Sequence, residues 1–135
     1  MVRVNSVPPE NFPRICAITL GEIEAGNLIT ASTNQLQRDA FMDYVFKWFL
    51  PRTIYIKDTT RQSYAEIIGK ILTKYPMTQK SQKTERHLVE NVGVDINDVW
   101  IASVALQHNL ILVTHDGMEK IKELIEPELE FDDWL

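Results

Sequence analysis

The 135-residue sequence has one cysteine, three histidines and no long apolar run, and each scarcity excludes a class of protein. Cys16 cannot form an internal disulfide, so a disulfide-stabilised secreted fold is excluded and a reducing, cytoplasmic setting is expected. The histidines lack the paired spacing of a zinc site. No apolar run approaches the roughly 20 residues that span a bilayer, so we expect no membrane span or signal peptide.

Length and charge restrict the number of domains and the class of protein further. The length and the 44% hydrophobic content predict one domain over residues 1–135, with an irregular, proline-bearing lead-in over 1–14. The formal charge of −5 argues against a globally basic surface for nucleic acid. Residues 70–86 nevertheless carry four lysines, one arginine and one glutamate, whereas residues 116–133 carry eight acids and two lysines. The basic stretch either contacts a phosphate backbone or is an ordinary solvated surface, and composition alone favours the second.

Hydrophobic periodicity predicts an α/β order of elements. A short extended piece is expected at Ile15, helices near 19–30, 34–50, 59–74, 84–90, 98–108 and 118–125, and strands near 53–57, 110–114 and 129–134. Alternation also allows a short strand at 2–7. The clearest helix, 34–50, carries the stripe Phe41, Tyr44, Val45, Trp48 and Phe49, which we expect in the core. Its wide apolar surface also allows a subunit or partner interface.

Acidic residues stand where such a fold places ligands, at the carboxyl ends of strands and the starts of helices. Asp116 follows the strand 110–114, although an aspartate before glycine is also ordinary turn chemistry. Asp98 opens a helix with a buried stripe, where an acid also favourably meets the helix dipole. Glu22 and Glu24 lie in similar apolar surroundings, so periodicity does not choose between them, and each alone is more simply a half-exposed glutamate.

Taken together, these segments resemble a known family. The blocks are Ile18–Gly26, Thr53–Lys74, Asn97–Ser103, Leu112–Asp116 and the ending Phe131–Trp134. In order and spacing they resemble the PIN-domain ribonucleases, in particular the VapC toxins of type II toxin–antitoxin systems. The resemblance selects Glu22 over Glu24, Asp98 over Asp95, and Asp116 with Thr114 as a supporting hydroxyl. It implies a three-layer α/β/α fold with a mostly parallel sheet.

The resemblance also implies an activity. Carboxylates converging on one pocket are hard oxygen ligands suited to Mg²⁺ or Mn²⁺, and such an ion activates water against a phosphodiester. We therefore expect a metal-dependent endoribonuclease in which Glu22, Asp98 and Asp116 hold the metal. Members of the family cut structured RNA, often transfer RNA or ribosomal RNA, are inhibited by a cognate antitoxin protein, and commonly form homodimers.

One family feature is missing. The family opens with a central strand that ends in an aspartate, between the strands represented here by 53–57 and 110–114, and no aspartate precedes Asp39. Truncation, a strand supplied by another chain, substitution by 2–7, or a degenerate fold would each account for this, and we favour a truncated nuclease that dimerises. Losing one metal ligand puts cleavage by this polypeptide itself in question.

Two alternatives stay open. The first is a catalytically inactive binding or assembly module with the PIN fold. The second, much weaker, is a phosphoacceptor domain like a response regulator, which lacks its acidic pair and its lysine here.

Overall fold

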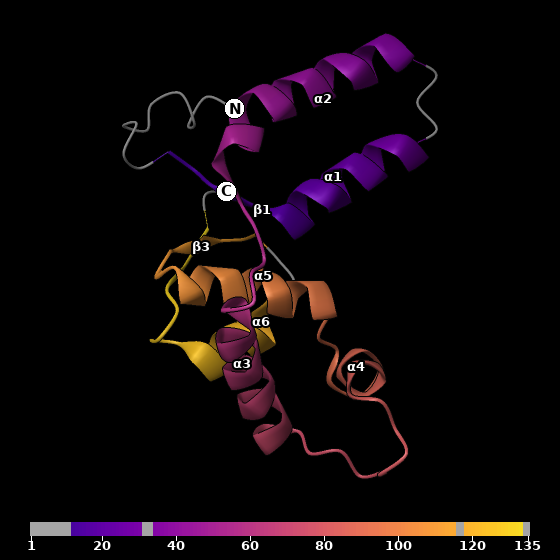
Figure 1. Ribbon diagram of the computed structural model, residues 1–135. Coiled ribbons are helices and arrows are strands. Elements are labelled where there is room, and N and C mark those ends of the chain that lie inside the picture. Colours follow the sequence, from indigo (N-terminus) through magenta and orange to yellow (C-terminus); the bar gives the residue numbers. More distant parts are fainter. Residues whose placement is uncertain (1–11, 31–33, 116–117, 134–135) are drawn as a thin grey trace. The chain divides into compact units, whose positions relative to one another are not determined.

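The computed structural model describes residues 12–30, 34–115 and 118–133, and the chain divides into two compact units at the Tyr55–Ile56 boundary (Figure 1). The segment 2–7, Asp116 and Trp134 lie outside the described residues. Within the described part of the chain, no helix is long and apolar enough to cross a membrane.

The first unit contains two helices and one pair of short parallel strands. Its elements in chain order are β1 (Ile15–Cys16), α1 (Ala17–Ile29), α2 (Gln35–Phe49), a 3-10 turn (Leu50–Arg52) and β2 (Thr53–Ile54). Ile15 lies opposite Thr53 and Cys16 opposite Ile54 in the parallel register. Parallel strands need a long crossover connection, and the two helices supply it.

Helix α2 forms where the periodicity predicts it, and it buries part of the predicted stripe. The Asn34 side chain accepts a hydrogen bond from the Gln37 backbone N–H at 3.2 Å, which caps the helix. Met42 and Val45 are buried against Leu20 of α1. Phe41, expected in the core, is 44% exposed. Val45 of the predicted stripe is buried and Phe49 packs against the same cluster, so the buried face includes Met42 in place of Phe41.

The second unit is mainly helical. Its elements are α3 (Thr60–Lys74), α4 (Thr84–His87), a π-helical turn (Leu88–Val92), α5 (Ile96–Gln107), β3 (Leu112–Val113), α6 (Glu119–Ile125) and β4 (Phe131–Asp132). Helix α3 packs against both α5 and α6. The helices between residues 56 and 125 lie within two or three residues of their predicted bounds, because caps and apolar stripes are local signals.

The core of the second unit joins these three helices. Ile67 and Ile71 of α3 are fully buried together with Val99 of α5 and Ile121 and Ile125 of α6. Full burial of one such side chain stabilises a fold by about 1.5–3 kcal/mol relative to leaving it exposed. Helices α5 and α6, which precede and follow β3 in the chain, are therefore firmly held by this core.

The rings of Tyr64 and Trp100 stack at the junction of α3 and α5, with centroids 3.9 Å apart. Burial, and to a lesser degree the charge of Glu85, raises the pKa of Tyr64. The helix predicted near 59–74 is thus a packing element of this core.

The strands are shorter than the sequence predicts and occur as two parallel pairs. In the second unit Leu112 lies opposite Phe131 and Val113 opposite Asp132. The predicted strands 53–57 and 110–114 shrink to Thr53–Ile54 and Leu112–Val113, since a strand extends only as far as its partner supplies backbone hydrogen bonds. The α/β class with parallel strands is confirmed.

Candidate active site

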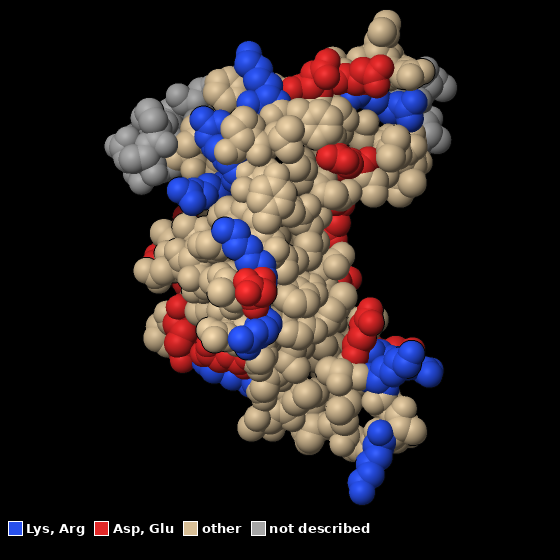
Figure 2. Space-filling view, viewed as in Figure 1, with Lys and Arg blue, Asp and Glu red and all other residues tan. Residues whose placement is uncertain are grey.

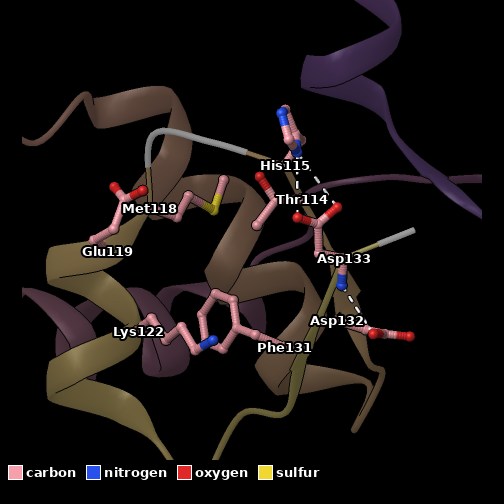
Figure 3. Close-up of a pocket in the computed structure, with 8 residues that line it drawn as sticks. All are labelled: Thr114, His115, Met118, Glu119, Lys122, Phe131, Asp132 and Asp133. Atoms are coloured by element: carbon pink, nitrogen blue, oxygen red, sulfur yellow. Dashed lines mark hydrogen bonds and ion pairs between the residues drawn. The ribbon is translucent and has the colours of Figure 1, made fainter. Parts of the chain in front are cut away.

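A pocket of about 340 Å³ lies at the carboxyl ends of β3 and β4, beside the start of α6 (Figure 3). In parallel sheets this end is where ligands gather. The pocket is lined by Thr114, His115, Met118, Glu119, Lys122, Phe131, Asp132 and Asp133. It brings together residues that directly follow one strand with residues that end its neighbour, more than a dozen positions later.

Hydrogen bonds hold the two strand ends in register at this pocket. The Leu112 backbone N–H donates to the Glu130 carbonyl at 2.9 Å, and the Thr114 N–H donates to the Asp132 carbonyl at 3.0 Å. One residue further on, His115 Nδ1 lies 3.2 Å from Oδ2 of Asp133. Both side chains are well exposed, so this pair contributes at most about 1 kcal/mol to stability. Its effect is to orient the His115 ring at the pocket rim.

Thr114, selected as a supporting hydroxyl, is thus a pocket residue. Asp116, the acid it was expected to support, lies outside the described residues. Its neighbours in sequence, His115 and Met118, both line the pocket. The assignment of Asp116 as a site residue therefore stays a prediction.

Asp98 lies in the first turn of α5, and neighbouring residues supply the helix cap and the buried face of this turn. The Asp95 side chain accepts a hydrogen bond from the Asn97 backbone N–H at 2.7 Å, so Asp95 caps the helix. Asp98 is half-buried, and Val99 and Ala102 behind it are fully buried. The helix cap therefore does not depend on Asp98, although its position still favours a negative charge.

Glu22 belongs to α1 of the first unit, whereas Asp98 and Thr114 belong to the second. Glu22 is exposed and Glu24 is half-buried. In the described ranges, no group of three or more His, Cys, Asp or Glu side chains is arranged to hold a metal ion. The metal ligand set Glu22, Asp98 and Asp116 stays a prediction.

Sequence reasoning gave a role to Thr114 alone among the residues that line this pocket. His115, Phe131, Asp132 and Asp133 stood inside the family blocks without a function of their own. The usable signal was the predicted parallel strands at 110–114 and 129–134, because residues that follow neighbouring parallel strands lie side by side.

The basic stretch 70–86 is only partly available to a ligand. Lys70 Nζ lies 3.0 Å from Glu128 and Lys74 Nζ lies 3.8 Å from Glu123. Figure 2 shows blue and red side chains interspersed over the second unit, with blue ones over the loop between α3 and α4. Much of this stretch is therefore an ordinary, ion-paired protein surface.

Comparison with known proteins adds to this geometry. A family model described as "PIN domain" matches residues 14–124. No curated protein sequence matches the chain.

Solved structures with a similar fold include VapBC2 from Rickettsia felis bound to a DNA fragment from its promoter, with 21% identity, a TM-score of 0.63, and 93% of this chain and 78% of that chain covered. VapBC-1 from nontypeable Haemophilus influenzae gives 22% identity and a TM-score of 0.64 over 98% and 82% of the two chains. VapBC-5 from Mycobacterium tuberculosis, of the VapBC family of toxin–antitoxin systems, gives 20% and 0.61 over 95% and 87%.

Proposed function

Because the chain belongs to the PIN domain family, we propose that it is a metal-dependent endoribonuclease of the VapC toxin type. The observation that carries the proposal is the family match over residues 14–124, which includes the segments of Glu22, Asp98 and Asp116. The pocket beside Asp116 in sequence, at the carboxyl ends of β3 and β4, supports it.

The donor chemistry suits a divalent ion. Glu22, Asp98 and Asp116 supply only carboxylate oxygens, which Mg²⁺ and Mn²⁺ prefer over softer metals. Glu22 is exposed and Asp98 half-buried at a helix start, so neither carboxylate is locked inside the apolar core. When bound, such an ion supplies an activated water and neutralises charge on the attacked phosphate. The three residues would hold it, and Thr114 would orient Asp116 through its hydroxyl.

The partners follow from the same proposal. The substrate is an RNA, of the transfer or ribosomal class. The similar structures named above are VapBC assemblies, which favours a cognate antitoxin as protein partner. Exposed apolar residues on the first unit, among them Leu28, Ile29 and Leu36, suit a protein interface with the antitoxin or with a second copy of the chain.

Metal binding and cleavage are best tested separately. Isothermal titration with Mn²⁺ should detect binding by the wild-type chain that is lost in Asp98→Asn and Asp116→Asn. Cleavage of a transfer RNA pool should require Mg²⁺ or Mn²⁺ and should be abolished by the same substitutions. Asp95→Asn is the matched control, because it changes a neighbouring acid that only caps α5.

Two results would contradict the proposal. Unchanged cleavage in both aspartate variants would remove the metal mechanism. Absence of any Mn²⁺ binding that depends on the three acids would instead favour a PIN-fold binding module without catalysis.

A further inference from the structure

The pocket at the ends of β3 and β4 has a chemistry that differs from the predicted metal centre. Part of its lining is apolar, because Met118 is only 7% exposed and the Phe131 ring is half-buried. The rest is polar and includes His115, Asp133, Glu119 and Lys122. The described residues give it no ligand set for a metal ion. A ligand with a flat apolar face and a polar edge fits this combination.

The size of the pocket limits the ligand further. A volume of about 340 Å³ stands at the lower end of the roughly 300–1,000 Å³ typical of small-molecule sites. It suits one planar ring system and is too small for a helical segment of nucleic acid. Unpaired RNA bases are typically recognised by stacking on aromatic side chains, histidine included, and by hydrogen bonds to their Watson–Crick edge.

The side chains on the rim supply both contacts. Asp133 lies 3.2 Å and 3.4 Å from Nδ1 of His115 through its two carboxylate oxygens, which favours this orientation of the ring at the rim. A carboxylate offers about four acceptor positions, so Asp133 can hold His115 and accept from a ligand as well. In Figure 3 the two side chains face each other on one side of the pocket, with Phe131 and Lys122 along another.

Aspartate accepts from amino groups of bases, as in its contacts with the N4 amino group of cytosine. Adenine, cytosine and guanine carry such an amino group and uracil does not. Uracil can donate only its ring N3–H, which lies between two carbonyl oxygens that repel a carboxylate, so a carboxylate on the rim favours the first three bases.

We propose that this pocket binds one unpaired RNA base that carries an amino group, with Asp133 accepting from that group and Phe131 and His115 contacting its face. This inference rests on the proposed function for its substrate. His115 directly precedes Asp116, the predicted metal ligand, in the sequence. The bound base would thus set the sequence preference of cleavage.

The test uses binding without metal. Fluorescein-labelled single-stranded rA6, rC6 and rU6 are titrated with the full chain in EDTA and followed by fluorescence anisotropy. The wild-type chain should bind rA6 and rC6 about five- to tenfold more tightly than rU6, which corresponds to the low end of the ~1–3 kcal/mol discrimination of such contacts. Asp133→Asn should reduce this ratio to about one, because an amide both donates and accepts.

Two further variants separate the contacts. Phe131→Leu should weaken binding of all three oligonucleotides by about the same factor, since stacking is tolerant of sequence. Glu130→Gln, an exposed acid directly before β4 that does not line the pocket, is the control and should leave the ratio unchanged. Circular dichroism melts of each variant confirm folding.

The outcomes discriminate between this inference and the proposed function. Equal binding of the three oligonucleotides by the wild-type chain, or an undiminished preference in folded Asp133→Asn, would overturn the base pocket. Loss of Mn²⁺-dependent cleavage alone leaves the preference measured in EDTA intact, so failure of the nuclease proposal is recognised separately.

Discussion

Replacing Thr60 with valine should destabilise the chain by about 1–2 kcal/mol, because one buried hydroxyl joins the start of α3 to the end of α5. Thr60 has no exposed surface. Its Oγ1 accepts from the Lys57 backbone N–H at 3.0 Å and donates to Oε1 of Gln107 at 2.5 Å. Gln107 Nε2 in turn donates to Thr59 Oγ1 at 2.7 Å. Valine keeps the shape of threonine but removes both bonds.

The magnitude follows from where the partners lie. A net intramolecular hydrogen bond contributes about 0.5–1.5 kcal/mol, and a buried partner left unsatisfied costs about 1–3 kcal/mol. Lys57 is exposed and Gln107 is half-buried, so water reaches both partners and the smaller figures apply. At about 3–5 °C per kcal/mol for a domain of this size, the midpoint of thermal unfolding should fall by ~3–10 °C.

Urea unfolding followed by circular dichroism measures the effect directly, with Thr59→Val as the matched control. The Thr59 residue is exposed, so its loss should cost no more than about 0.5 kcal/mol. Combined with Gln107→Leu, Thr60→Val should show non-additivity of roughly 0.5–1 kcal/mol, since the two side chains share one hydrogen bond. The reasoning fails if Thr60→Val is no more destabilising than Thr59→Val.

Two further predictions concern the same unit. Gly93 has φ of 78°, so Gly93→Ala should cost about 1–2 kcal/mol in urea unfolding, and an unchanged midpoint would show that the turn adapts. A backbone hydrogen bond, and then the Lys70 ammonium 3.0 Å away, lowers the pKa of Glu128 from its ordinary value of 4.5. A carboxyl group whose pKa is lower in the folded state stabilises the fold at pH values above its unfolded pKa of about 4.5. The free energy of unfolding should therefore fall as the pH drops below about 4.5. Lys70→Gln should flatten this acid-side loss in pH-dependent melts, and an identical pH profile would contradict the contribution of the ion pair.

Local signals explain which elements could be predicted. Asn34 and Asp95 cap α2 and α5 through their own side chains, and the apolar spacing of α3 places Ile67 and Ile71 in the core. Such patterns involve residues within one or two helical turns, so they are visible in the sequence. Phe41 shows the limit, because the buried face of α2 includes Met42 and leaves Phe41 exposed.

The candidate site also contains residues that the sequence indicated and residues that only the structure brought together. The acids Glu22, Asp98 and Asp116 were selected by a resemblance, and the match to a PIN domain model over residues 14–124 supports the family from which they were carried over. Apart from Thr114, the residues of the pocket at β3 and β4 received no role from that resemblance. Asp133 and His115 are separated by 18 positions and meet only because two parallel strands end side by side.

The sequence by itself therefore determined the helices, the α/β class and the family, since these depend on short-range periodicity, capping and the order of motifs. The tertiary structure decided that Met42 and not Phe41 is buried on α2, how short the strands are, and that His115, Phe131 and Asp133 share a pocket. These features depend on contacts between distant segments, and the free energy of such contacts is set by packing and strand register that no local pattern encodes.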